Sequence, residues 1–196
     1  MGMKHTILAS CTGLVAIAVT LVEPGQDGAK PAIRSRILEA ENGERTLMQE
    51  VLLEASVAEV WKAYTTDAGF AAWAAPVAEV DLRAGGTIRT HYRPDAKIGD
   101  VGTNTLHIVN YVPERLLTLR AELQENWPEV MKHDAGNLMN VIVFLPEAEK
   151  RTRILSYGCG YGRAAAYEQL LEFFAKANEG LFRKLRAHLE EQARGH

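Results

Sequence analysis

Cysteine is scarce in this chain, which has two in 196 residues, Cys11 and Cys159. Two cysteines cannot build the framework of several bridges that small disulfide-rich scaffolds use. If an N-terminal segment that carries Cys11 is removed, Cys159 is the only thiol left and no intramolecular disulfide can form. Cys159 stands between two glycines at the end of an expected strand. We therefore predict a small buried hydrophobe there, rather than a catalytic nucleophile.

A surplus of charge of one sign is also lacking. The 22 lysines and arginines are interspersed with 25 aspartates and glutamates, which gives a formal net charge of −3. Such a chain offers no basic field to a phosphate backbone, so we expect no nucleic-acid partner. The hydrophobic content of 47% in 196 residues suits one domain with one core.

The chain contains no nucleophile elbow, phosphate-binding loop or dinucleotide fingerprint. None of its histidines stands in a metal-ligand spacing. We therefore predict no metal and no cofactor, and we assign no catalytic residue. His91 alternates with Arg89 and Arg93 along an expected strand, which predicts that its ring faces water.

An apolar run long enough to span a membrane is missing as well. The run Ile7–Val22 has 16 residues, below the roughly 18 needed for a span. Because it follows Lys4, it predicts a signal peptide or an N-terminal anchor over residues 1–22. Three outcomes stay open: cleavage after Ala18, lipidation of Cys11, and retention of the segment as an anchor.

The predicted signal peptide or anchor over residues 1–22 indicates export. We expect a periplasmic or extracellular protein, with membrane association through the N-terminal segment as an alternative. Residues 23–45, with prolines and glycines in their first part, are predicted to be a linker. The folded domain is predicted over residues 46–193.

The segment Met48–Gly86 carries the most informative pattern of the chain. Residues 48–55 predict a strand, and the next four form a capping box, in which Ser56 and Glu59 satisfy free N–H groups at a helix start. A second helical piece ends near Trp73 and leads into another strand over residues 78–82. The segment therefore predicts a strand, two short helices and a second strand.

This order of elements resembles the SRPBCC superfamily, with its START-like helix-grip fold. Within it, the chain is similar to the branch named for the activator of the heat-shock-protein ATPase. The residues that carry the resemblance are Val60-Trp61, Thr65-Thr66-Asp67, Trp73, Pro76, Arg83-Ala84-Gly85-Gly86, Pro113-Glu114-Arg115-Leu116, Glu179-Gly180-Leu181 and Leu185–Glu190. Relatives often have Gly-Trp in the last helix, where this chain has Gly180-Leu181, so one interior aromatic is missing.

Periodicity predicts an α+β fold. Strict alternation over Leu117–Leu123 marks a strand, and six more are expected over residues 48–55, 78–82, 88–92, 106–111, 141–145 and 152–159. About seven strands with one polar face favour a curved antiparallel sheet covered on one side. The cover is a long C-terminal helix over residues 164–193, with an apolar stripe at spacings of three and four. Gly180 inside this helix predicts a close approach to the sheet or a slight bend.

The resemblance implies a cavity between the sheet and the last helix, suited to a hydrophobic or amphipathic ligand. The candidate ligand-binding residues are Trp73, Tyr92, His107, Leu119, Trp127, Phe174 and Asn178. Plain core packing is the favoured alternative for Leu119 and Phe174. Asn178 either contacts the ligand, or faces solvent at the helix margin or bonds to a strand end. Trp127 either closes the cavity mouth or folds onto the surface of the domain.

Together these features predict an exported, non-enzymatic protein that binds an apolar or amphipathic small molecule. One alternative is an enzyme of the cyclase or hydratase kind, with His107 or Tyr92 as the acid-base group. A second alternative is a co-chaperone-like module that binds another protein, which the resemblance alone suggests. The fold by itself does not choose among them.

Overall fold

The computed structural model describes residues 32–125, 127–133 and 136–195. The expected N-terminal segment 1–22, with its alternatives at Cys11 and Ala18, lies outside these ranges, as do the first residues of the expected linker. Within the described ranges, no helix combines the length and the apolar composition that crossing a membrane requires.

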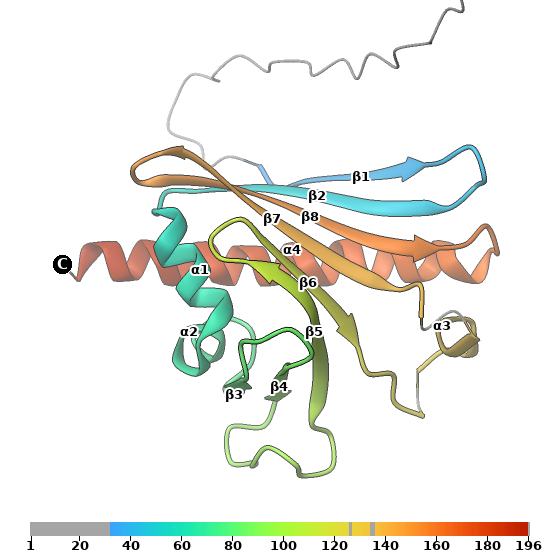
Figure 1. Ribbon diagram of the computed structural model, residues 1–196, viewed down its shortest axis with the longest axis horizontal. Helices are drawn as coiled ribbons and strands as arrows, with labels where there is room; N and C mark the ends of the chain where they lie inside the picture. Colours follow the sequence, from blue (N-terminus) through green and yellow to red (C-terminus); the bar gives the residue numbers. More distant parts are fainter. Residues whose placement is uncertain (1–31, 126, 134–135, 196) are drawn as a thin grey trace, which may run out of the picture. The chain divides into compact units, whose positions relative to one another are not determined.

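An antiparallel sheet lies along a long C-terminal helix, and Figure 1 shows the curvature of the sheet. The described residues form eight strands in the spatial order β1-β2-β8-β7-β6-β5-β4-β3. The strands are β1 (Arg34–Glu39), β2 (Arg45–Leu53), β3 (Val77–Val80), β4 (Thr87–His91), β5 (Asn104–Val112), β6 (Leu116–Ala121), β7 (Met139–Ala148) and β8 (Arg151–Tyr161). The helices are α1 (Val57–Thr65), α2 (Asp67–Ala71), α3 (Glu129–His133) and α4 (Ala166–Arg194). The predicted α+β helix-grip architecture is confirmed.

Strand β1 corrects the predicted domain start, because it lies inside the expected linker 23–45. It pairs antiparallel with β2 from Arg34 opposite Glu50 to Glu39 opposite Arg45. All six of its residues are exposed. Backbone pairing rather than burial holds the strand, so no alternation of apolar and polar residues marks it in the sequence. The domain therefore begins before residue 46.

The two short helices after β2 are held by their caps. The Ser56 hydroxyl accepts from the Glu59 backbone N–H, and the Glu59 carboxylate accepts from the Ser56 N–H at 2.7 Å. This confirms the predicted capping box. Thr66 caps α2 through its hydroxyl, and the Asp67 carboxylate accepts from the backbone N–H of Val80 at 2.8 Å. The Thr-Thr-Asp motif therefore ends one helix, starts the next and ties that helix to β3.

The core lies where α1 and α4 meet the sheet. Strand β2 turns Leu47, Val51 and Leu53 inward, each at most 2% exposed, as alternation predicts. Phe144 on β7 is fully buried, and its ring packs edge-on against Trp61 and Tyr64 of α1 with centroid distances of 5.3 Å. These aromatic contacts anchor α1 to the middle of the sheet.

Gly180 does not make the predicted close approach. A Cβ atom built on Gly180 meets nothing within 4 Å, so the position faces open space. A glycine inside a helix costs about 1 kcal/mol relative to alanine. No steric contact of a Cβ atom therefore requires glycine at this position.

His91 does not face water, in contrast to the prediction. It is 4% exposed, because the loop that follows β4 folds over it. Its Nδ1 accepts from the Arg93 backbone N–H at 3.0 Å, and its Nε2 lies 3.2 Å from the Val101 carbonyl oxygen. Alternation along β4 could not show this cover, because the loop comes later in the chain.

Candidate functional site

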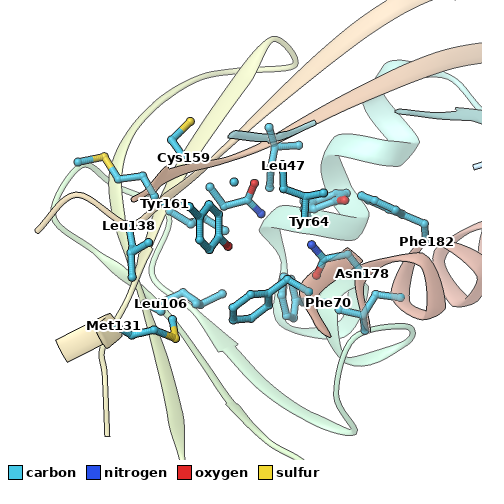
Figure 2. Close-up of a pocket in the computed structure, with 18 of the residues that line it drawn as sticks. Leu47, Tyr64, Phe70, Leu106, Met131, Leu138, Cys159, Tyr161, Asn178 and Phe182 are labelled. Atoms are coloured by element: carbon cyan, nitrogen blue, oxygen red, sulfur yellow. The ribbon is translucent and has the colours of Figure 1, made fainter. Parts of the chain in front are cut away.

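A cavity of about 300 Å³ lies between α4, the inner face of the sheet and the short helices (Figure 2). It receives side chains from α1, α2 and α4, from strands β2, β5, β6, β7 and β8, and from the connection between β6 and β7. The residues that line it are Leu47, Tyr64, Phe70, Trp73, Tyr92, Leu106, Leu119, Ala121, Trp127, Met131, Leu138, Met139, Asn140, Ile142, Gly158, Cys159, Tyr161, Phe174, Asn178, Leu181 and Phe182. The lining is mostly aliphatic and aromatic, as in most small-molecule sites.

Six of the seven predicted site residues line this cavity: Trp73, Tyr92, Leu119, Trp127, Phe174 and Asn178. Trp73 is 7% exposed, and its indole N–H donates to the Ala63 carbonyl at 2.9 Å, which fixes the ring in the wall. Leu119 also belongs to the core, at 5% exposed. Tyr92 is 66% exposed although it lines the cavity, which places it at the border with solvent.

His107 is the exception. Its neighbours on β5, Leu106 and Ile108, pack in the core, so the alternation of the strand turns His107 to the opposite face. There its Nε2 lies 3.3 Å from the Glu122 carboxylate. The prediction that His107 binds a ligand in the cavity is therefore wrong. On β5 the side chains of Leu106 and Ile108 face inward, and that of His107 faces outward.

The connection between β6 and β7 closes one side of the cavity. Trp127 stacks on Phe174 of α4, with ring centroids 6.4 Å apart and planes 29° apart. The Tyr167 hydroxyl donates to the carbonyl oxygen of Val130 at 3.1 Å. Met131 of α3, which is 4% exposed, adds its side chain to the wall. The short helix α3 was not predicted, because its five residues are too few for a periodic pattern.

Asn178 is held in place by a hydrogen-bond network that joins α4 to two strands. Its Nδ2 donates to Oε1 of Gln49 at 2.9 Å, and Gln49 is 1% exposed. The Gln49 amide nitrogen donates in turn to the Ser35 hydroxyl and to the Ala175 carbonyl oxygen, both at 3.0 Å. The network leaves Oδ1 of Asn178 free to accept from another group, within the described part of the chain.

Tyr161 is a cavity residue that the sequence analysis missed. Simple alternation along β8 places it on the face opposite Ile154, which is fully buried. The pairing of β8 with β2 shifts between Gly158 and Tyr161, and Gly160 takes a left-handed φ of 90°. This irregularity turns the Tyr161 ring inward, where it is 7% exposed. Two glycines inside a strand were the available signal.

The hydroxyl of Tyr161 makes no hydrogen bond to any residue that the structure describes. Figure 2 shows Tyr161 and Asn178 among the side chains around the same cavity. Burial, together with the neighbouring Cys159, raises the pKa of Tyr161 to about 12. Tyr64 on α1 also lines the cavity, and burial raises its pKa too. Both phenols therefore keep their protons and remain donors near neutral pH.

The described lining of the cavity has no acidic or basic side chain. No Lys, Arg, His, Asp or Glu occurs among the described residues that line the cavity. Over the same described ranges, no group of three or more His, Cys, Asp or Glu side chains could hold a metal ion. A second hollow of about 360 Å³, between β1 and α4, differs in having Arg36, Glu168 and Glu172 in its walls. The first cavity is therefore the one suited to an apolar molecule.

Cys159 lines the first cavity, and the pH dependence of its thiol reactivity can be measured. Burial raises its pKa, against a hydrogen bond with Thr46 that lowers it. Because the thiolate is the reactive form, we expect iodoacetamide to modify Cys159 at a higher midpoint pH in the folded chain than in urea. Rates measured against pH on a Cys11→Ser variant test this. An equal or lower midpoint in the folded state would contradict it.

The comparisons with known proteins agree with this architecture. The family model described as "Activator of Hsp90 ATPase homolog 1-like protein" matches residues 54–190. No curated protein matches the chain. The matched residues run from the residue after β2 into the last turns of α4 and include every residue of α1, α2 and α3.

Solved structures share the fold at low sequence identity. The Aha1 dimer from Colwellia psychrerythraea is 16% identical with a TM-score of 0.55, over 74% of this chain and 96% of that chain. CalU16 from Micromonospora echinospora is 19% identical with a TM-score of 0.56, over 80% and 83%. A protein from Nitrosomonas europaea is 20% identical with a TM-score of 0.57, over 75% and 95%. With its matched sequence and its helix-grip architecture, the chain belongs to the family of activator of Hsp90 ATPase homolog 1-like proteins.

Proposed function

We propose that this protein is exported and binds an apolar or amphipathic small molecule in the cavity between the sheet and α4. One observation carries the binding proposal: a cavity of about 300 Å³ with a mostly apolar lining. That volume is about twice the 150 Å³ of an apolar cavity that accepts benzene. Export is supported by the uncharged run after Lys4 alone.

The alternative as a cyclase or hydratase receives less support from the site. His107 lies outside the cavity beside Glu122, and Tyr92 is 66% exposed. General acid-base catalysis needs a titrating group within hydrogen-bond reach of a bound substrate. The phenols that do lie inside, Tyr64 and Tyr161, have raised pKa values, which suits donors of hydrogen bonds.

Native mass spectrometry of the protein from its own source is the direct test. We expect a co-purified apolar compound that is lost on denaturation. The denatured mass also decides export, because cleavage after Ala18, a lipidated Cys11 and an intact N-terminus give three different masses. A chain with its N-terminal segment intact and no membrane attachment would contradict export.

A cavity-filling variant provides the matched control for binding. Ala121 lines the cavity at the end of β6, so Ala121→Trp should fill it and abolish uptake of the co-purified compound. Ala148→Trp makes the same change at an exposed end of β7 and should leave uptake unchanged. Equal uptake by both variants would show that the compound binds elsewhere.

A further inference from the structure

The polar groups of the cavity restrict the charge of what it can hold. The lining has no cationic side chain among the described residues to pair with a carboxylate or phosphate, and no anionic one to pair with an amine. An ion that leaves water without a partner loses its hydration, and this costs several kcal/mol even after relaxation. An uncharged molecule avoids that cost. The cavity therefore selects against ions of either sign.

The same cavity is not purely apolar, because Tyr161 brings a hydroxyl into it. The side chain is 7% exposed, and within the described chain its hydroxyl has no hydrogen-bond partner. Because this hydroxyl is not fully buried, it stays accessible from the cavity, and the oxygen of a bound ligand can accept a hydrogen bond from it. Asn178 also lines the cavity, and its Oδ1, which accepts from no described residue, can accept a hydrogen bond from a second polar group of a ligand.

We propose that the ligand is an uncharged molecule of roughly bicyclic aromatic size whose carbonyl oxygen accepts a hydrogen bond from Tyr161. This rests on the proposed function and names the chemical class of its ligand. Ketones, esters and amides belong to the class. Carboxylates of the same carbon skeleton do not, although their shape is nearly the same.

Three probes of matched shape test the inference on the full chain by equilibrium dialysis: 2-acetylnaphthalene, 2-naphthoate and naphthalene. At pH 7.5 we expect the ketone to bind at least about tenfold more tightly than the carboxylate, because the carboxylate loses its hydration. At pH 5 the gap should narrow, since carboxyl groups approach their titration range. Equal affinity of ketone and carboxylate at pH 7.5 would overturn the inference.

Tyr161→Phe isolates the hydrogen bond to the ligand, because the lost hydroxyl bonds to no residue in the described ranges. We expect the ketone to bind about 3- to 10-fold more weakly to this variant, while naphthalene binds as before. Tyr157→Phe makes the same change on the same strand at a residue that does not line the cavity, and should alter neither affinity. An equal loss for ketone and naphthalene would contradict the assigned hydrogen bond.

The outcomes separate this inference from the proposed function. If none of the three probes binds the unaltered chain, the proposed binding function fails and the inference fails with it. If naphthalene binds but 2-naphthoate binds as tightly as the ketone, only the inference fails. In that case the charged group remains in water at the border near Tyr92, which is exposed.

Discussion

Replacing Phe144 with alanine is expected to lower the free energy of unfolding by about 3–5 kcal/mol, the usual cost of removing a buried aromatic ring. Phe144 is fully buried on β7, and its ring joins Trp61 and Tyr64 of α1 to the sheet. For a domain of this size, the loss corresponds to a fall in Tm of roughly 6–20 °C. Thermal and urea unfolding, followed by circular dichroism, measure both quantities.

Phe173→Ala is the matched control for this change. Phe173 is 62% exposed on α4, so removal of its ring should change the free energy of unfolding by no more than about 0.5 kcal/mol. A similar loss for the two variants would show that burial does not set the cost. A loss below about 1 kcal/mol for Phe144→Ala would show that the core relaxes around the missing ring.

Gly160→Ala should also be strongly destabilising, by about 2–5 kcal/mol. Gly160 has a left-handed φ of 90°, which costs a non-glycine residue about 1–2 kcal/mol. A Cβ at this position would lie 2.1 Å from the carbonyl oxygen of Asn137, so the backbone must shift, and overpacking of this kind costs about 1–3 kcal/mol more. Urea unfolding gives the total. The variant should also bind the cavity probes more weakly, because the next residue is Tyr161.

Two other glycines separate the contributions. Gly85 has a φ of 76° and nothing within 4 Å of a built Cβ, so Gly85→Ala measures the backbone strain without the clash. Gly180→Ala has neither strain nor clash and should raise stability by up to about 1 kcal/mol. Gly160→Ala must cost more than Gly85→Ala. Equal costs would show that the contact with Asn137 yields freely.

Local patterns in the sequence predicted most of the fold. The capping box at Ser56, the alternation around Leu119 and the stripe on α4 each depend on residues a few positions apart. Strand β1 is held by backbone pairing with β2 although all six of its residues are exposed, and His91 is covered by the loop that follows β4. Patterns of period two or 3.6 indicate neither the pairing of an exposed strand nor the cover of a loop. The predicted linker at β1 and the predicted exposure of His91 were therefore wrong.

The candidate site was predictable in part for the same reason. Trp73 and Asn178 were found because a known architecture places their elements around a cavity. His107 was misplaced because the inward phase of β5 could not be told from its sequence. Tyr161 was missed because a register shift and a left-handed glycine reverse its side. The first error came from an undetermined strand phase, and the second came from a change of phase within a strand.

Strand β1 also has a consequence for solubility. It pairs with β2, which carries buried Leu47 and Val51, and so covers backbone groups that would otherwise be free to pair with another molecule. An open strand edge is a template for aggregation, and charged residues on an outer strand discourage it. The outermost strand here presents Arg34 and Arg36 to solvent. The segment predicted to be a linker therefore covers the edge of β2. A chain shortened to begin at residue 46 would expose that edge to other molecules.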